Sequence, residues 1–425
     1  MAKKKLLILG ATTETIFMVK KAETMGIETF VVDPYIDAPA KKYSSHPIEE
    51  DCFNIESILS IINKNNIDGV LPGCADILVF VYEEICRKAN KYCYVNKDIV
   101  KVFNNKKGLK DILNKHGLAT IKEYTYEEVA NSSFNNFPVF VKPTDNNSSK
   151  GMSVVNNREE FELAYKKAVE NSRSKTILIE KYMNCDDFFV GYVIQDGKVS
   201  VTFTSDRFVN SEQKGVGSIT QGIIYPSKYT NLYFSSVHSK MLDIFKELEF
   251  KNGILHIQGF VDNEGIKFYD PALRITGGQE YLFLEHINDF DLLKCLINFA
   301  ITGKMSETDI SDKCNYTFNK KYACNLVFSV KGGIIGKIDG IEYAKKHNNV
   351  INVTQEHFVG ELIDKIGTAQ QNISRMHLIA DSKEELLKAI DDLQRYVVVY
   401  DEKGNNMMLK GFDASKWLNS KGENK

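Results

Sequence analysis

The feature that most constrains the fold of this 425-residue chain is a regular alternation of short apolar runs and helical patterns at its start. The run KLLILGA precedes a helical pattern that extends to Met25, and GIETFVVDP follows with an acidic residue near its end. A second helical pattern covers residues 54–65, and the run IDGVLPG and an apolar helix beginning near Asp76 come next. Strands that alternate with helices of this length form parallel sheets, whose ligands lie beyond the carboxyl ends of the strands. We therefore expect a parallel α/β domain here.

Charge and hydropathy exclude several classes of function. Lys and Arg number 54 against 56 Asp and Glu, so the net charge of −2 creates no field that would attract nucleic acid or an anionic membrane. No run of about 18 apolar residues occurs, which argues against a membrane span. Gly10 stands alone where a dinucleotide fingerprint would need GxGxxG, which argues against a nicotinamide or flavin cofactor.

The start of the chain and its cysteines predict a cytoplasmic protein. Three lysines precede only a short apolar run, and no small-residue cleavage site follows, so we do not expect a signal peptide. The eight cysteines form neither a CxxC pair nor a dense framework, which is typical of reduced thiols.

The pattern changes after residue 103. The stretch KKGLKDILNKHG predicts a helix that ends at Gly117, and the strand FPVFVKP and the polar loop TDNNSSKGM follow. After a helix from Arg158, the runs TILIEKYM and FFVGYVIQDGKV predict strands, the second run turning at an Asp-Gly pair. The run GILHIQGFVDNEGIKFYDPALR predicts another hairpin. These elements indicate α+β lobes built on antiparallel sheets.

The polar, glycine-containing stretch 205–226 is interpreted as a mobile loop near a site. An arginine in such a loop can bind a substrate carboxylate with two hydrogen bonds. Candidate residues for contact with a second substrate are Asp206, Arg207, Lys214 and Gln221.

Lys142 is the residue that points most clearly to chemistry. It ends an apolar strand before Pro143, and the small polar residues after it run to Lys150 and Gly151. A loop of this kind can fold over phosphates, with backbone N–H groups and the lysine charge facing the anion. Lys106 upstream and Glu180 downstream complete a set that fits ATP: the lysines for the phosphates, and Glu180 with the backbone after it for the adenine edge.

The segments FPVFVKPTDNNSSKGM, LIEKYM and DPALRITGGQ together resemble the ATP-grasp superfamily in its carboxylate-amine ligase branch, which includes amino-acid ligases and biotin-carboxylase-like enzymes. This resemblance extends over nearly the whole chain. It implies that ATP is bound by Lys106, Lys142, Ser149, Gly151, Glu180, Lys181, Met183 and Asp187.

The metal-binding end departs from the pattern of that family. Family members carry carboxylates and an Asn where this chain has Gln258, Asp270 and Ala272, with an Arg that matches Arg274. The resemblance implies that Asp270, helped by Gln258, holds Mg²⁺ and that Asp270 and Arg274 are catalytic. Ala272 supplies no ligand. Nearby candidates that could compensate are His256, Asp262 and Glu280, although His256 also fits an ordinary core position.

The resemblance implies three domains: an N-terminal α/β domain over residues 1–103, a two-lobed ATP-grasp core over 104–305 with a lid lobe at about 118–183, and an α+β C-terminal subdomain over 306–425. It implies an enzyme that joins a small carboxylate to an amine through an acyl phosphate, using ATP and Mg²⁺ and releasing ADP and phosphate. A homodimer is compatible with the family.

Two alternatives remain open at this point. The opening GIETFVVDPYIDAPA also resembles bicarbonate-activating carboxylases of purine metabolism. The depleted metal positions Gln258 and Ala272 suit a nucleotide-binding regulator that has kept the fold and lost the reaction.

Overall fold

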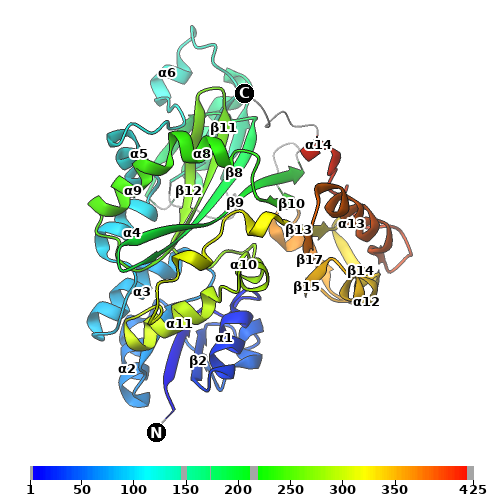
Figure 1. Cartoon of the computed structure of the whole chain (residues 1–425). Helices are drawn as coiled ribbons and strands as arrows, with labels where there is room; N and C mark the ends of the chain where they lie inside the picture. The colour runs from blue at the N-terminus through cyan, green and yellow to red at the C-terminus, as the bar shows by residue number, and fades with distance from the viewer. Residues whose placement is uncertain (1–2, 145–150, 173, 211–218, 419–425) are drawn as a thin grey trace.

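A computed structural model describes residues 3–144, 151–172, 174–210 and 219–418 of the chain. Figure 1 shows the N-terminal domain below a long central sheet, a small lobe carrying α6 above it, and the C-terminal helices α12, α13 and α14 at one side. Among the described helices, none combines the length and apolar composition that crossing a membrane would require.

The N-terminal domain is the parallel α/β unit expected from the sequence. Its sheet has the order β3-β2-β1-β4, and every pairing is parallel. Residues 6–9 of β1 are fully buried because helices cover both faces of a parallel sheet. The elements are β1 (Lys5–Leu9), α1 (Thr15–Thr24), β2 (Glu28–Asp33), a short 3₁₀ helix (Pro39–Tyr43), β3 (His46–Glu49), α2 (Ile55–Asn65), β4 (Gly69–Pro72) and α3 (Ile77–Lys88).

The small lobe is a three-stranded antiparallel sheet of order β6-β5-β7 with α7 packed against it. Its hydrophobic cluster contains Val139, Phe161 and Ile179, and every buried member lies between residues 124 and 179. The lobe therefore has a core of its own. The segment comprises α4 (Lys97–Phe103), α5 (Lys106–Lys115), α6 (Tyr126–Ala130), β5 (Val139–Pro143), β6 (Ser153–Val155), α7 (Arg158–Glu170) and β7 (Ile177–Lys181).

The central sheet has eight strands in the order β12-β11-β8-β9-β10-β13-β17-β15. The part of the chain from residue 186 to residue 302 forms the first five strands of this sheet, including both expected hairpins, β8–β9 and β11–β12. The same part of the chain also forms helices α8 to α11. The bounds are β8 (Asp186–Gln195), β9 (Lys198–Asn210), β10 (Ile219–Tyr225), α8 (Thr230–Ser236), α9 (His238–Glu247), β11 (Gly253–Asp262), β12 (Gly265–Ala272), α10 (Tyr281–Asn288) and α11 (Leu292–Thr302).

The expectation of a loop over 205–226 was wrong for most of its length. Residues 205–210 continue β9, residues 219–225 form β10, and the two strands pair with each other. The polar side chains there are compatible with strands because they find partners across the sheet: Arg207, for example, stands directly opposite Asp187. Lys214 lies outside the described residues.

The C-terminal part adds three strands to the same sheet, since β13 pairs with β10 and β17 lies between β13 and β15. The sheet is thus continuous across the expected boundary at residue 305, and the three-domain division stays a prediction. The elements are 3₁₀ turns (Ser311–Lys313, Phe318–Lys320, Ala369–Gln371), β13 (Tyr322–Ser329), β14 (Gly333–Asp339), α12 (Ile341–Lys346), β15 (Val350–Gln355), β16 (Leu362–Ile363), β17 (Asn372–Ala380), α13 (Lys383–Tyr396), β18 (Val398–Asp401) and α14 (Ser415–Leu418).

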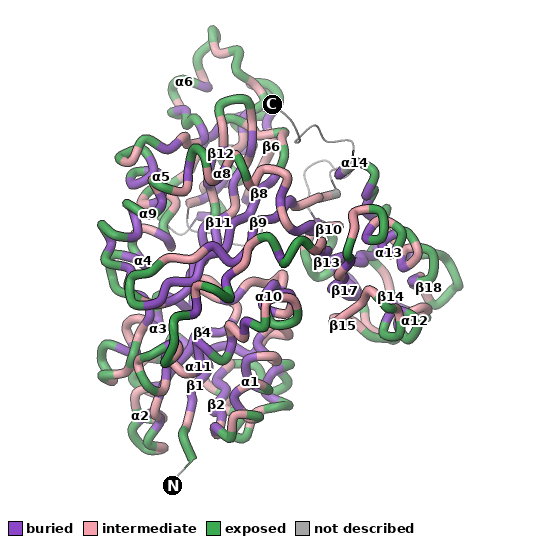
Figure 2. Tube along the Cα trace, viewed as in Figure 1, coloured by how far each residue is buried: buried purple, intermediate pink, exposed green. Residues whose placement is uncertain are grey.

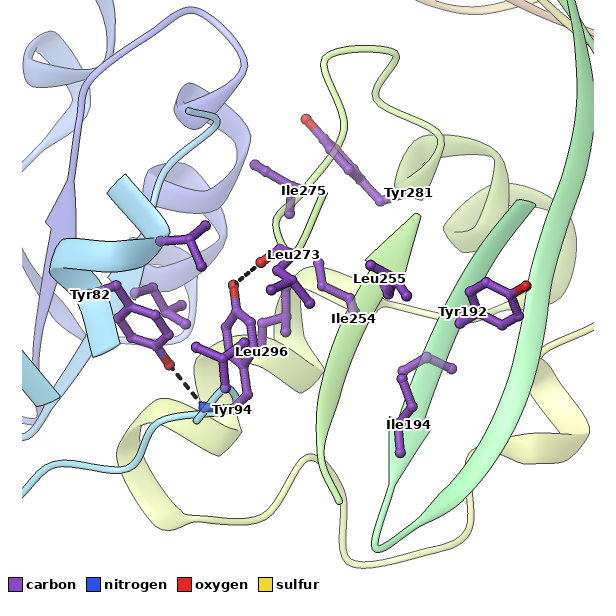
Figure 3. Packing of buried hydrophobic residues seen from close by; sticks show 14 of the residues in the cluster. Tyr82, Tyr94, Tyr192, Ile194, Ile254, Leu255, Leu273, Ile275, Tyr281 and Leu296 are labelled. Atoms are coloured by element: carbon purple, nitrogen blue, oxygen red, sulfur yellow. Dashed lines mark hydrogen bonds between the residues drawn. The ribbon is translucent and has the colours of Figure 1, made fainter. Parts of the chain in front are cut away.

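One hydrophobic cluster joins the N-terminal domain to the central sheet, and Figure 2 shows buried segments running through both. Tyr94, which follows α3, donates a hydrogen bond from its hydroxyl to the carbonyl oxygen of Leu273 at 2.9 Å, and its own N–H donates to Tyr82 (Figure 3). All three residues are buried. This contact fixes the end of β12 against the N-terminal domain, one residue before Arg274.

Candidate active site

The site begins with three charged side chains that meet beside the small lobe. Lys142 on β5 lies with its Nζ 2.5 Å from Glu180 Oε2, and Lys110 on α5 lies with its Nζ 2.6 Å from Glu180 Oε1. Lys110 also pairs with Glu123 and donates to the carbonyl oxygen of Ile121 at 3.1 Å. The side chains of Lys142, Lys110 and Glu180 are at most 10% exposed, so both Glu180 oxygens are bound by buried cations.

The charges keep Glu180 ionised. Burial acts to raise the pKa of its carboxyl group, but Lys142 and Lys110 lower it by more, and the net pKa lies below the ordinary value. The ionised Glu180 therefore holds Lys142 in place.

Lys106 on α5 and Asp270 on β12 interact electrostatically. Burial lowers the pKa of the half-buried Lys106, and repulsion from Lys142 lowers it further, while Asp270 and Glu180 act in the opposite direction. The carboxylate of Asp270 is accessible to solvent, but surrounding protein removes part of its hydration and raises its pKa, against the charges of Lys106 and Lys142. Two lysines and one carboxylate thus share one electrostatic environment.

Asp187 and Gln258 belong to one hydrogen-bonded network with Arg207 and Tyr269. Arg207 donates from Nε to Asp187 Oδ2 at 2.7 Å, and the hydroxyl of Tyr269 lies 3.2 Å from Asp187 Oδ1 and 2.8 Å from Gln258 Oε1. That hydroxyl has one proton, so it donates to one of the two acceptors at a time. Burial raises the pKa of Asp187 by more than Arg207 lowers it.

Arg274 connects the end of β12 to the N-terminal domain. Its Nη2 donates to Asp76 Oδ2 at 2.7 Å, and its Nη1 donates to the carbonyl oxygen of Ile275 at 2.8 Å and lies 3.4 Å from Cys74 Sγ. Asp76 and Cys74 follow β4, at the carboxyl end of the parallel sheet. This is the edge at which such sheets bind ligands.

Comparisons with known proteins show which family this chain resembles. A family model described as "D-ala D-ala ligase C-terminus" matches residues 112–268. Formate-dependent phosphoribosylglycinamide formyltransferase from Prochlorococcus marinus (strain MIT 9515) is 27% identical over 309 residues, which cover 70% of this chain and 77% of that protein. The chain belongs to the ATP-grasp superfamily.

Two solved structures share the ATP-grasp architecture over almost the whole chain. L-amino acid ligase from Bacillus licheniformis has a TM-score of 0.77 at 18% identity, covering 94% of this chain and 99% of that one. Phosphoribosylglycinamide synthetase from Anaerococcus prevotii has a TM-score of 0.72 at 16% identity, covering 94% and 100%. These likenesses confirm the multidomain fold class.

The ATP-grasp assignment makes the segment after Glu180 the candidate adenine edge. The amide of Lys181 donates to Lys122 O at 2.9 Å, and the amide of Tyr182 donates to Pro138 O at 3.2 Å. Within the described residues the amide of Met183 has no such backbone partner. Gly151 has a φ of +76°, which favours glycine, and Ser149 lies outside the described residues.

Several side chains suggested for the second substrate or the metal have partners within the protein or lie in its core. Gln221 donates to the carbonyl oxygens of Lys410 and Gly411, and Asp206 accepts from Ser227 and Lys228. Burial lowers the pKa of His256 to about 3, which agrees with a core position.

The residues at the metal end fit one Mg²⁺ ion better than two. In the described part of the chain, no group of three or more His, Cys, Asp or Glu side chains could hold a metal ion. Asp262 pairs with Lys267 at 2.8 Å, and Gln258 Oε1 lies 2.8 Å from the hydroxyl of Tyr269, which can donate to it. Mg²⁺ commonly binds one or two carboxylates together with substrate phosphates and keeps several waters. Asp270 with a triphosphate meets that requirement, whereas Ala272 offers no donor for a second ion.

Sequence reasoning missed Lys110, Tyr269 and Asp76. A signal for Lys110 was present, because it follows Lys106 by four residues and therefore lies one turn further along the same face of α5. The parts played by Tyr269 and Asp76 depend on contacts between segments distant in sequence, and no local pattern marks them.

Proposed function

We propose that this ATP-grasp protein is an ATP-dependent ligase that joins a carboxylate to an amine through an acyl phosphate. The observation that carries the proposal is the electrostatic coupling of Lys106, Lys142 and Arg274 to Asp270: each cation acts to lower the pKa of that carboxyl group, although burial raises the pKa overall. Lys142 on β5 and Lys106 on α5 are thus coupled to a carboxylate on β12, as is the arginine that follows this strand. That arrangement suits phosphoryl transfer, in which the protein mainly positions the reactants and neutralises charge.

The chemistry proceeds in two steps. A carboxylate oxygen of the first substrate attacks the γ-phosphorus, the bond to the bridging oxygen breaks, and ADP leaves with an acyl phosphate formed. The amine nitrogen of the second substrate then attacks the acyl carbon, phosphate leaves, and the nitrogen loses a proton. Lys106 and Lys142 would neutralise the phosphate oxygens, and Arg274 the charge that develops at the reacting carboxyl group. Mg²⁺, where Asp270 holds it with the phosphates, would supply further charge neutralisation.

The names of similar proteins support the ligase class. The curated relatives are named for a formate-dependent formyl transfer to phosphoribosylglycinamide, and one solved neighbour is named an L-amino acid ligase. Another neighbour is a biotin carboxylase domain whose structure contains MgADP and bicarbonate.

A second candidate function, a nucleotide-binding regulator, is favoured by one observation. Gln258 is neutral and lies within hydrogen-bond distance of Tyr269, and Ala272 has no ligand atom. These positions therefore supply fewer metal ligands than a two-ion site requires. Such a protein would bind ATP and not turn it over.

Release of ADP tests the proposal. The purified chain with Mg²⁺ and ATP is assayed against a panel of carboxylates, including formate and bicarbonate, each with and without a panel of amines. We expect ADP release that requires a carboxylate and increases with an amine. Dependence on bicarbonate alone would support a carboxylase instead. Tight ATP binding without ADP release from any pair would support the regulator.

A further inference from the structure

The loop between β12 and α10 contains an unusual concentration of unpaired polar atoms. Nine buried side-chain nitrogen or oxygen atoms in the described residues have no hydrogen-bond partner, and four of them lie within residues 274–280. These four atoms are Arg274 Nε, Thr276 Oγ1, Gln279 Nε2 and Glu280 Oε2. A buried polar atom without a partner costs about 1–3 kcal/mol, so a cluster of them indicates a place for a ligand.

Glu280 is the buried carboxylate of this loop. It is 2% exposed, and its Oε1 accepts from the hydroxyl of Tyr225 at 2.8 Å, while its Oε2 has no partner among the described residues. The carboxyl group lies close to the backbone of Gly278: a Cβ atom at that position would be only 2.2 Å from Glu280 Oε1. A buried carboxylate with one unsatisfied oxygen is suited to a ligand that donates hydrogen bonds or carries positive charge.

The unpaired atoms at this loop include both hydrogen-bond donors and hydrogen-bond acceptors. Arg274 Nε and Gln279 Nε2 are donors, whereas Glu280 Oε2 and Asp76 Oδ1 are acceptors without a partner. The orientation of the Gln279 amide is fixed, since its Oε1 accepts a hydrogen bond from Thr354 at 2.9 Å. The ligand therefore needs an acceptor group and a donor group close together.

Both arginines near this loop in the described part of the chain are already paired and are not free to bind a phosphate group. Arg274 is paired with Asp76, and Arg375 on β17 donates from Nε to Glu356 Oε1 at 2.6 Å. Each arginine thus has a carboxylate partner, and Glu280 adds a further carboxylate. A phosphomonoester carries nearly two negative charges and would require basic groups that this loop does not provide.

We propose that the carboxylate substrate is a free α-amino acid, with its carboxylate beside Arg274 Nε and its ammonium group beside Glu280 Oε2. This inference rests on the proposed ligase function and names the substrate class for that same site. A zwitterion satisfies the unpaired donors and the unpaired acceptors together and adds no net charge. Substrates built on a phosphorylated ribose, like those in the names of the curated relatives, fit the loop poorly.

The unmodified protein provides the first test. Each common L-amino acid is supplied with Mg²⁺ and ATP, and hydroxylamine traps the acyl phosphate as a hydroxamate. The same assay is run with the deaminated and the N-acetylated analogue of each amino acid, and with formate plus a phosphoribosyl amine. For at least one amino acid we expect kcat/KM for ADP release to exceed that of its deaminated analogue by about a hundredfold or more.

The variant Glu280→Gln keeps an acceptor for Tyr225 and removes the negative charge. We expect it to raise the KM for the amino acid about tenfold or more and to change the KM for the deaminated analogue much less, because only the amino acid carries the ammonium group. The control Glu384→Gln, on the exposed surface of α13, should keep the native ratio between the two substrates. Thermal unfolding of each variant shows that it is folded.

The outcomes separate the two levels of the account. Equal or better turnover of the deaminated analogue, the N-acetyl analogue or the phosphoribosyl amine would overturn the amino-acid assignment and leave the ligase function standing. Failure of every carboxylate to release ADP would overturn the ligase function itself, and the substrate assignment with it.

Discussion

Lys142 Nζ and Glu180 Oε2, on the neighbouring strands β5 and β7, lie 2.5 Å apart with side chains only 7% and 3% exposed. Lys110 binds the other oxygen of the same carboxylate at 2.6 Å. With two lysines on one glutamate, Lys142 can turn to a phosphate while Lys110 continues to neutralise Glu180. The pair is thus compatible with the phosphate-binding role proposed for Lys142.

Replacement of Lys142 tests this role. The variant Lys142→Met should weaken ATP binding about thirtyfold, since a charge-assisted hydrogen bond contributes about 2 kcal/mol. Isothermal titration calorimetry measures the change. The matched control Lys166→Met removes an exposed lysine from α7 of the same lobe and should bind ATP as the native chain does. Equal affinity for the two variants would remove Lys142 from the nucleotide site.

Lys110 should matter for stability as well as for position. The variant Lys110→Met leaves a buried carboxylate with one cation fewer, and we expect the free energy of unfolding to fall by about 3 kcal/mol. The double variant Lys110→Met/Glu180→Gln should lose less than the sum of the single variants, because removing the carboxylate relieves the unpaired charge. Denaturant unfolding of all four proteins measures the coupling. Strict additivity would mean that the two side chains do not interact.

Two adjacent glycines offer a matched comparison. A Cβ atom at Gly278 would meet the carboxyl group of Glu280, whereas a Cβ atom at Gly277 meets nothing within 4 Å. We expect Gly278→Ala to displace Glu280 from Tyr225, to cost about 1–2 kcal/mol of stability and to raise the KM for the carboxylate substrate. Gly277→Ala should stay within about 0.5 kcal/mol of the native chain. Identical behaviour of the two variants in unfolding and kinetic assays would contradict this packing.

The buried carboxyl group of Asp206 should make the free energy of unfolding depend on pH. Burial raises the pKa of its carboxyl group from 3.8 to about 6, although Ser227 and Lys228 donate hydrogen bonds to it. The folded chain holds this proton to higher pH than the unfolded chain, so the contribution of Asp206 to the free energy of unfolding falls as pH rises from about 4 to about 6. The fall amounts to about 3 kcal/mol.

The variant Asp206→Asn does not titrate and isolates this effect. The difference in free energy of unfolding, native minus variant, should decrease by about 3 kcal/mol between about pH 4 and pH 7. Denaturant unfolding at a series of pH values measures it. Asp243→Asn, on the exposed surface of α9, should give a nearly constant difference. A constant difference for Asp206→Asn too would show that its pKa is not raised.

Local sequence signals predicted most of the elements. Asn54 caps α2 by accepting from the amide of Ser57, Gly117 has a positive φ just after α5, and Asp196 and Gly197 form the turn between β8 and β9. Each of these signals depends on residues close together in the chain, which is why a single sequence reveals them.

The stretch 205–226 shows where such reasoning fails. Its polar residues suggested a loop, but Arg207 is neutralised by Asp187 on the neighbouring strand, and Asp206 accepts from Ser227 after β10. These partners lie about 20 residues away, so composition alone could not distinguish a polar strand from a loop. The same limit hid Asp76 as the partner of Arg274.

The most direct test of the central claim follows the oxygen atoms of the carboxylate. A carboxylate substrate that supports turnover is labelled with ¹⁸O, incubated with the protein, Mg²⁺, ATP and an amine, and the released phosphate is analysed by mass spectrometry. An acyl phosphate intermediate predicts one ¹⁸O atom in each phosphate released during ligation. Unlabelled phosphate accompanying the formation of ligated product would contradict the account.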